Sequence, residues 1–384
     1  MNISDNSQEQ QKNTNPALKS ILTLSVFILI IGGAFLLNLI MPKADVLQSE
    51  RRKPAAFPKL SADTILSSAF MDGFGKYATD NFIFRDAMRT IRALSVFDIF
   101  MQTDKSGLYI DDTVGAGKFE KADEKSVRKT AKKIRRICEL FPPELDIYYA
   151  IVPDKSIYVK RYLPGFDTDK AYEILTEELG GIKIIDLRDA LSGGDFYKTD
   201  IHWDQSKISK VPEALGKAMG FADRLDLNFT ANTAGIFDGV YTGQIALPLK
   251  QDNMTYMTSD ILNNAIVSYL SAKTGQWEEG LMYNAAAVNG RDPYDLFLGG
   301  VQPLITIENP SAKTDRQLYL FRDSFGSSLA PLLTPAYAKI TIIDVRYIDI
   351  RVLENYITFA QSDADVLFLY SSQILNNPAI LLVN

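Results

Sequence analysis

The chain has 384 residues and 46% of them are apolar, so it can build a substantial core in one or two domains. Its formal net charge of −6 gives no basis for nucleic-acid binding. With one cysteine, Cys138, and one histidine, His202, it has no internal disulfide and too few of the usual ligands for a zinc site. No metal or cofactor is expected.

The N-terminal region predicts a membrane anchor. Residues 1–20 are largely polar and predict a disordered cytoplasmic tail. Residues 21–41 contain no charge, and about 20 apolar residues in a helix span the hydrocarbon of a bilayer. A small-residue cleavage pattern does not follow, which favours an uncleaved single-pass helix over a signal peptide. Residues 42–60 form a charged, proline-containing linker.

The charges around this helix bear on its orientation. More lysine and arginine residues follow the apolar segment (Lys43, Arg51, Arg52 and Lys53) than precede it (Lys12 and Lys19). By the positive-inside rule this bias alone places the large domain in the cytoplasm.

Residues 61–384 predict an α/β domain with a parallel sheet and helices on both faces. Residues 70–86 show helical spacing of apolar residues. Further on, helices and continuous apolar strands alternate, as parallel sheets require. The predicted helices are residues 120–141 and 171–179, and the predicted strands are residues 145–152 and 182–187.

The second half of this domain begins irregularly. Residues 221–300 lack clear periodicity apart from a helical pattern at 261–272, and predict an insertion or lid-like region. Regular order then resumes, with strands predicted at residues 304–307, 317–321, 340–345 and 366–370.

A first candidate site lies in residues 196–203, which contain the single histidine. In an extended segment, Asp200 and His202 project to the same side. The carboxylate can then orient the imidazole and fix its tautomer, as a catalytic base requires. The alternative is that His202 is a structural residue beside a packed tryptophan, Trp203.

A second candidate site lies where a predicted strand ends and a helix begins. Ser324 falls at that junction, where backbone N–H groups and the positive end of the helix favour a nucleophile. The alternative is a helix N-cap. Since ligands of open parallel sheets bind at the carboxyl ends of strands, Ser324 and the Asp200–His202 pair can meet there.

These motifs together resemble the DHHW family of cell-surface proteins of Gram-positive bacteria. Residues 196–203 resemble its first signature, and residues 321–326 with 343–347 resemble its second. Residues 70–85 and 294–300 also match, so the resemblance covers roughly residues 55–384. That family is similar to the SGNH-hydrolase-like proteins of alginate O-acetylation.

The resemblance implies a catalytic triad of Ser324, His202 and Asp200. The Ser324 amide, with Gly299 or Gly300, would stabilise an oxyanion. The implied function is a membrane-anchored, extracytoplasmic acyl transferase or esterase acting on O-acetyl groups of a cell-envelope glycan. Transfer and hydrolysis are both open, and a membrane-bound O-acyltransferase is the implied acetyl donor. This places the large domain outside the cell, against the charge bias.

The chain departs from the family pattern at three positions. Ile201 replaces the first histidine of the family name, Val301 stands where an asparagine is expected, and Arg322 replaces a glycine of the acetylation proteins. Loss of the asparagine removes a side-chain oxyanion donor. The alternative function is therefore a non-catalytic envelope protein that keeps the fold and binds a glycan or an assembly partner.

Overall fold

The computed structural model describes residues 16–159 and 165–383. It divides the chain into two compact units, one ending at Arg89 and the other beginning at Thr90. The start of the α/β domain at residue 61 stays a prediction from the sequence. The first fifteen positions of the predicted disordered tail lie outside the described residues.

The first unit begins with α1 (Pro16–Ile40), an apolar helix whose side chains are largely exposed. Residues 17–40 have a mean hydropathy of 2.5. Within the part of the chain that the structure describes, this is the one helix long and apolar enough to cross a bilayer. Such a helix serves as a membrane anchor or as a signal sequence.

Three shorter helices follow α1. They are α2 (Ala62–Leu66), α3 (Ala69–Asp80) and α4 (Arg85–Leu94), which continues into the second unit. The sequence predicted one helix over residues 70–86. The structure breaks it after Asp80, because Asn81 caps α3 and its side-chain amide donates to the Tyr77 carbonyl oxygen at 3.0 Å.

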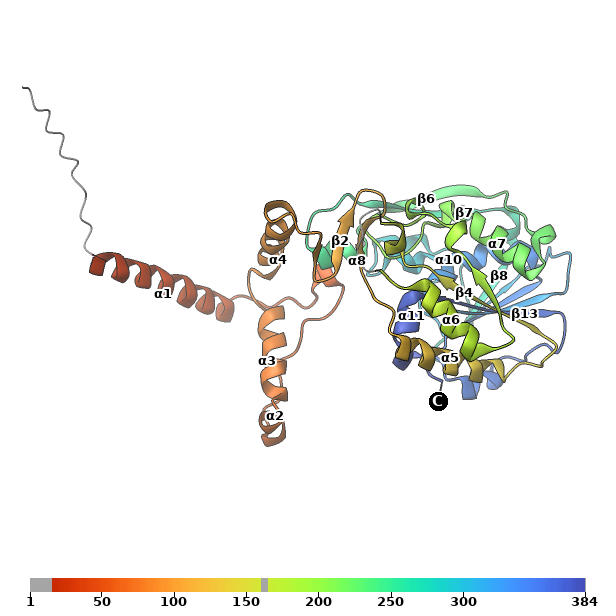
Figure 1. Ribbon diagram of the computed structural model, residues 1–384, viewed down its shortest axis with the longest axis horizontal. Coiled ribbons are helices and arrows are strands. Elements are labelled where there is room, and N and C mark those ends of the chain that lie inside the picture. Colours follow the sequence, from red (N-terminus) through yellow and green to blue (C-terminus); the bar gives the residue numbers. More distant parts are fainter. Residues whose placement is uncertain (1–15, 160–164, 384) are drawn as a thin grey trace, which may run out of the picture. The chain divides into compact units, whose positions relative to one another are not determined.

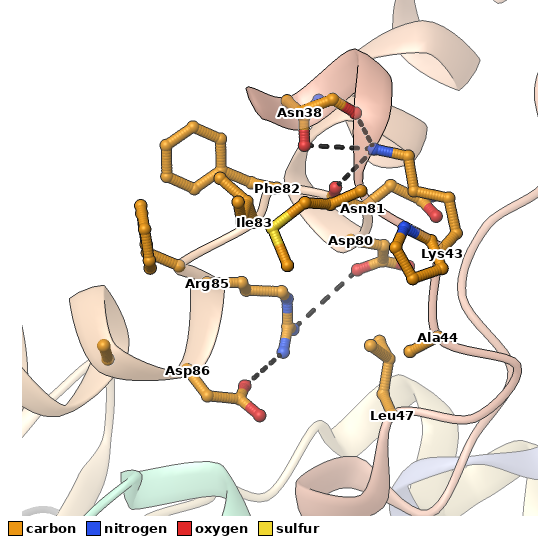
Figure 2. Close-up of a pocket in the computed structure, with 14 residues that line it drawn as sticks. Asn38, Lys43, Ala44, Leu47, Asp80, Asn81, Phe82, Ile83, Arg85 and Asp86 are labelled. Atoms are coloured by element: carbon orange, nitrogen blue, oxygen red, sulfur yellow. Dashed lines mark hydrogen bonds and ion pairs between the residues drawn. The ribbon is translucent and has the colours of Figure 1, made fainter. Parts of the chain in front are cut away.

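The segment between α1 and α2 is tied to α3 by an ion pair between an exposed arginine, Arg52, and a buried carboxylate, Asp80. The Asp80 carboxylate accepts from the Arg52 guanidinium at 2.5 and 2.7 Å and from the Ala55 amide at 2.9 Å. The hydrogen bond from Arg52 lowers the pKa of Asp80 to about 2. Figure 2 shows the adjoining hollow of about 300 Å³, where the Lys43 ammonium donates to Asn38 and to the carbonyl oxygen of Asn81.

The second unit is built on an eight-stranded sheet. Five parallel strands come first in its spatial order, and three antiparallel strands complete one edge. In that order they are β5 (Lys183–Asp186), β4 (Asp146–Val152), β13 (Ala364–Ser371), β11 (Gln317–Arg322), β12 (Lys339–Ile343), β10 (Leu304–Glu308), β8 (Ile266–Leu270) and β9 (Trp277–Glu279).

Helices cover both faces of this sheet, as the sequence predicted (Figure 1). On one face lie α5 (Glu124–Cys138), α6 (Thr168–Leu179) and α11 (Ser372–Asn376), and on the other lie α7 (Lys210–Met219) and α10 (Ser324–Leu333). Alternate residues of β13 face the two helical layers. Phe368 lies in the core shared with α5, α6 and α11, and Leu369 lies in the core shared with α7 and α10. All eight residues of β13 are buried, which explains its continuous apolar pattern.

The remaining elements are small. A three-stranded antiparallel sheet contains β1 (Asp104–Lys105), β2 (Leu108–Asp111) and β3 (Gly115–Lys118). A separate ribbon pairs β6 (Thr230–Phe237) with β7 (Asp252–Thr258), and α8 (Val240–Ile245) connects them.

The structure corrects two details of the sequence prediction. Residues 261–272 are not one helix. The short helix α9 (Asp260–Asn264) ends before β8, whose residues pair with β10. The predicted strand 304–307 is present as β10, but it runs antiparallel to β12. The identity of β8 and the direction of β10 both depend on how strands pair at this edge of the sheet, and local periodicity does not reveal such pairing.

Candidate active site

The segment carrying the histidine is a tight loop between β5 and α7. Phe196 and Trp203 form an isolated antiparallel bridge, and the Tyr197 amide donates to the His202 carbonyl oxygen at 3.0 Å. At the tip, Asp200 Oδ1 accepts the His202 amide at 3.1 Å. The aspartate therefore meets the histidine through a local turn rather than through the extended segment expected from the sequence.

The structure brings the three predicted catalytic residues together. His202 Nδ1 lies 2.7 Å from Asp200 Oδ1, and His202 Nε2 lies 2.7 Å from Ser324 Oγ. The imidazole thus bridges a carboxylate and a hydroxyl, each at hydrogen-bond distance. When Nδ1 carries the proton and donates it to Asp200, Nε2 is free to accept the serine proton.

Asp200 is fixed from both sides and stays ionised. Its Oδ2 accepts the Val240 amide at 2.9 Å, while Oδ1 serves His202. Burial by itself would raise the pKa of this carboxyl group. The hydrogen bond and charge of His202, with the amides of Val240 and His202, outweigh that effect and hold the Asp200 pKa well below its usual range.

Ser324 occupies the first turn of α10, directly after β11. Asp323 caps this helix, because its Oδ1 accepts the Phe325 amide at 3.1 Å. Asp323 Oδ2 also accepts the Ser371 amide at 2.8 Å, which ties the turn to the end of β13. The N-cap alternative for Ser324 is therefore wrong. Ser324 stands at the first helical position, half-buried among buried neighbours.

Two aromatic rings fix the plane of the imidazole. The Tyr294 ring stacks on His202 with centroids 3.7 Å apart and planes 11° apart, and Phe325 lies 5.0 Å away. The Tyr294 hydroxyl and the Trp203 indole N–H both donate to Ser328 Oγ at 2.7 Å. Ser328 lies one helical turn after Ser324, so the same helix carries both Ser324 and the hydroxyl that holds the rings around His202.

A buried lysine lies behind the histidine loop. Lys155 follows β4, is 2% exposed, and its ammonium donates to the carbonyl oxygens of Tyr197 and Asp200 at 2.9 and 2.8 Å. Burial lowers the Lys155 pKa to about 8, against the opposing charges of Asp200 and Asp154. On the outer side of the loop, the Asp252 carboxylate accepts the Thr199 amide and hydroxyl at 2.7 Å each.

The two glycines predicted to assist the oxyanion differ in their availability. Both have positive φ, 70° at Gly299 and 81° at Gly300. The Gly300 amide donates to the Phe297 carbonyl oxygen at 3.1 Å, so its hydrogen-bonding capacity is already used. Gly299 is exposed, and its role stays a prediction.

Sequence reasoning missed the supporting residues Tyr294, Ser328 and Lys155. A signal existed for two of them. Ser328 lies four positions after Ser324, on the same helical face, and Lys155 stands at the carboxyl end of a buried strand. For metals, the structure offers no group of three or more potential ligands within residues 16–159 and 165–383.

Comparison with solved structures shows where this fold occurs. A DHHW family protein from Eubacterium siraeum DSM 15702 matches 72% of this chain and 95% of its own, with 19% identity and a TM-score of 0.57. PatB1 of Bacillus cereus matches 70% of this chain and 96% of its own, with 16% identity and a TM-score of 0.53. PatB1 has also been solved with a sulfonyl adduct.

A third solved structure, the O-acetyltransferase domain of Pseudomonas putida AlgJ, matches with a TM-score of 0.43 and 13% identity, over 72% of this chain and 93% of its own. No family model and no curated protein matches the sequence. The first two likenesses confirm the fold: the chain shares the α/β architecture of these two proteins, and one apolar helix precedes it.

Proposed function

We propose that the protein is a membrane-anchored, extracytoplasmic acyl transferase or esterase that acts on O-acetyl groups of a cell-envelope glycan. The observation that carries this proposal is the continuous hydrogen-bond chain from Asp200 through His202 to Ser324. Such a chain activates a serine hydroxyl for nucleophilic attack on an acyl carbonyl.

In the first step, Ser324 Oγ attacks the acetyl carbonyl carbon while its proton passes to His202 Nε2. Asp200 stabilises the resulting imidazolium and keeps its orientation. The negative charge on the carbonyl oxygen is stabilised by the Ser324 amide at the N-terminus of α10, with Gly299 as a further candidate donor. His202 then gives the proton to the leaving oxygen, and an acetyl-serine ester remains.

In the second step, a hydroxyl group attacks the acetyl-serine ester and loses its proton to His202. The Ser324 oxygen leaves and regains a proton from the imidazolium. Water in this role gives hydrolysis and free acetate. A sugar hydroxyl gives transfer, with the same balance of atoms. A membrane-bound O-acyltransferase would supply the acetyl group in the transfer reaction, and α1 would keep the enzyme at that membrane.

The direct test measures turnover of an acetyl ester, 4-nitrophenyl acetate, by the full chain in detergent. Ser324→Ala should lower turnover by at least about 10³-fold. Ser327→Ala is the matched control: Ser327 lies in the same helix and is buried, and among the described residues it makes no hydrogen bond to His202. Equal turnover by wild type and Ser324→Ala would refute the enzymatic function.

A second readout tests the nucleophile itself. An aryl sulfonyl fluoride should attach one sulfonyl group to Ser324, detected by mass spectrometry of the intact chain. Labelling should vanish in Ser324→Ala and decline in Asp200→Asn. Absence of both turnover and labelling in the wild type would instead favour the non-catalytic glycan-binding alternative.

A further inference from the structure

A polar hollow lies on the sheet face that carries α5 and α6, beyond the edge of that helical layer. Its volume is about 550 Å³, within the range of small-ligand sites. Strands β8, β10, β11 and β12 form its floor, and the segment that follows residue 355 forms a rim. The Tyr319 hydroxyl holds this rim, because it accepts the Ala360 amide at 2.7 Å and donates to the Thr358 carbonyl oxygen at 3.3 Å.

Hydroxyl groups cross the floor of the hollow in one row. Strand register places Ser268 opposite Thr306, Thr306 opposite Thr341, and Thr341 opposite Tyr319. Directly opposed residues point to the same face of a sheet. Neighbouring strands are about 4.8 Å apart, so the row is roughly 14 Å long.

The two central hydroxyls of this row belong to buried residues but lack partners. Thr306 is 8% exposed and Thr341 is 3% exposed. Counting every residue that the structure describes, neither hydroxyl makes a hydrogen bond, yet both residues line the hollow. Neither hydroxyl oxygen is among the fully enclosed side-chain atoms that lack a partner, so both open into the hollow and are available to a ligand rich in hydrogen-bonding groups.

The residues at the margins of the hollow provide aromatic surface, and their charges cancel. Trp277 and Tyr356 line it and keep 39% and 37% of their surface exposed. The charged residues Lys339 and Glu308 pair with each other at 3.0 Å. Aromatic faces suit the C–H faces of sugar rings, and a hydroxyl row suits their O–H groups. The neutral balance of charge disfavours a phosphate or another ionic ligand.

We propose that this hollow, the Trp277 groove, is a binding site for an uncharged oligosaccharide. It is separate from the proposed active site: Tyr319 precedes Ser324 by five positions, roughly 16 Å along an extended strand. The groove would hold a glycan chain on the enzyme while chemistry proceeds at the carboxyl ends of the strands. Binding here requires neither Ser324 nor catalysis.

The two tryptophans of the chain provide the test. Trp203 is fully buried, whereas Trp277 is open to a quencher. Full chain in detergent is titrated with three uncharged hexasaccharides, of α-linked glucose, β-linked glucose and β-linked N-acetylglucosamine, in the presence of acrylamide. At least one should protect Trp277 fluorescence from quenching, with saturation. Protection by none of the three would overturn the proposal.

Variants then assign the binding to the groove. By calorimetry, Trp277→Ala should weaken binding of the protecting sugar at least tenfold. Thr341→Val, which keeps the shape and removes the hydroxyl, should weaken it about fivefold with an unchanged melting temperature. Tyr347→Ala, the loss of an exposed aromatic outside the groove, should leave binding unchanged.

Ser324→Ala separates this inference from the proposed function. It should abolish ester turnover and keep full sugar binding. A loss of binding in Ser324→Ala, or full binding in Trp277→Ala, would place the sugar elsewhere and refute the groove.

Discussion

At the scale of single residues, the tautomer of His202 decides whether the serine can be activated. The imidazole accepts a proton at Nε2 only while Nδ1 carries one, and Asp200 enforces that arrangement because an ionised carboxylate can only accept. The low pKa of Asp200, held down by the hydrogen bond from His202 against the effect of burial, keeps it ionised at neutral pH.

Asp200→Asn should therefore lower ester turnover by about 10⁴-fold with little change of fold. The amide can donate to Nδ1 and so stabilise the opposite tautomer, in which Nε2 carries the proton. Steady-state kinetics with 4-nitrophenyl acetate measures the effect. Asp189→Asn, at an exposed position, is the control. A loss smaller than tenfold would mean that Asp200 does not orient the base.

Lys155 is unusual because a charged group is buried beneath the histidine loop. A lysine in the unfolded chain keeps its proton up to its ordinary pKa of 10.5, whereas folded Lys155 loses it above about 8. Between these pH values the unfolded state binds more protons. The contribution of Lys155 to the free energy of unfolding must then rise with pH.

This contribution can be measured against Lys155→Met, which has no titrating group at that position. Between pH 8 and pH 10.5 the difference in free energy of unfolding, wild type minus variant, should increase by about 3 kcal/mol. Denaturant titrations of both proteins across this range measure the difference, in which the other titrating groups cancel. A difference that does not change with pH would contradict the burial of a charged lysine.

The sequence predicted that Asp200, His202 and Ser324 lie close together, which the structure shows, but it did not predict the residues packed around them. His202 and Ser324 could be found because one is the only histidine and the other marks a strand-to-helix junction. Lys155 had a positional signal at the end of a buried strand, but its contacts, like those of Tyr294, join residues distant in sequence, and no local pattern predicts such contacts. Ser328 reads locally as an ordinary helical serine, although its hydroxyl accepts from two aromatic residues.

At the scale of elements, the close approach of β11 and α10 positions Ser324, the proposed nucleophile. A Cβ added to Gly326 would lie 2.4 Å from the Arg322 Cβ, so only glycine lets the helix start this near to the strand. Arg322 itself is buried and pairs with the Asp344 carboxylate at 3.1 Å, beyond β12. The turn that carries Ser324 is thus packed on both sides.

Gly326→Ala should destabilise the protein by roughly 1–3 kcal/mol, because Arg322 or the helix must move. The displaced turn should also lower ester turnover, since Ser324 would leave hydrogen-bond distance of His202. Thermal melting followed by circular dichroism and the ester assay measure both effects. Gly194→Ala is the control, because the nearest side-chain atom there is 3.7 Å from the added Cβ.

The helices and strands were predicted correctly where burial leaves a pattern of apolar residues within the element itself. The apolar runs of β4, β11 and β13 identified these strands, and the amphipathic pattern of α5 identified its helix. It failed at residues 261–272, because β8 lies next to the edge strand and its identity depends on pairing with β10 and β9. Strand direction was equally hidden, since an antiparallel β10 has the same composition as a parallel strand.

At the scale of the whole molecule, thiol labelling can measure the side of the membrane on which the second unit lies. The wild-type chain gives a clean background, because its one cysteine is a poor target: burial raises the pKa of the Cys138 thiol to about 12. The wild-type protein should therefore resist a membrane-impermeant maleimide at neutral pH.

Single cysteines introduced at exposed positions then report topology. Leu281→Cys, at a site that is 61% exposed, should be labelled in intact cells if the second unit is extracytoplasmic. Lys19→Cys, before the apolar segment, should be labelled only after the membrane is permeabilised. Gel-shift detection measures both. The reverse pattern would place the unit in the cytoplasm, as the lysine and arginine bias suggests.

The presence of a single imidazole in the chain has a practical consequence for spectroscopy. Isotope labelling of histidine alone would give proton and nitrogen resonances that need no assignment, because each belongs to position 202. Their chemical shifts would report which ring nitrogen carries the proton, and a titration of the resting protein would follow the protonation of the proposed general base directly. If the proposed acyl group forms on the neighbouring serine, the same resonances would register its formation and loss.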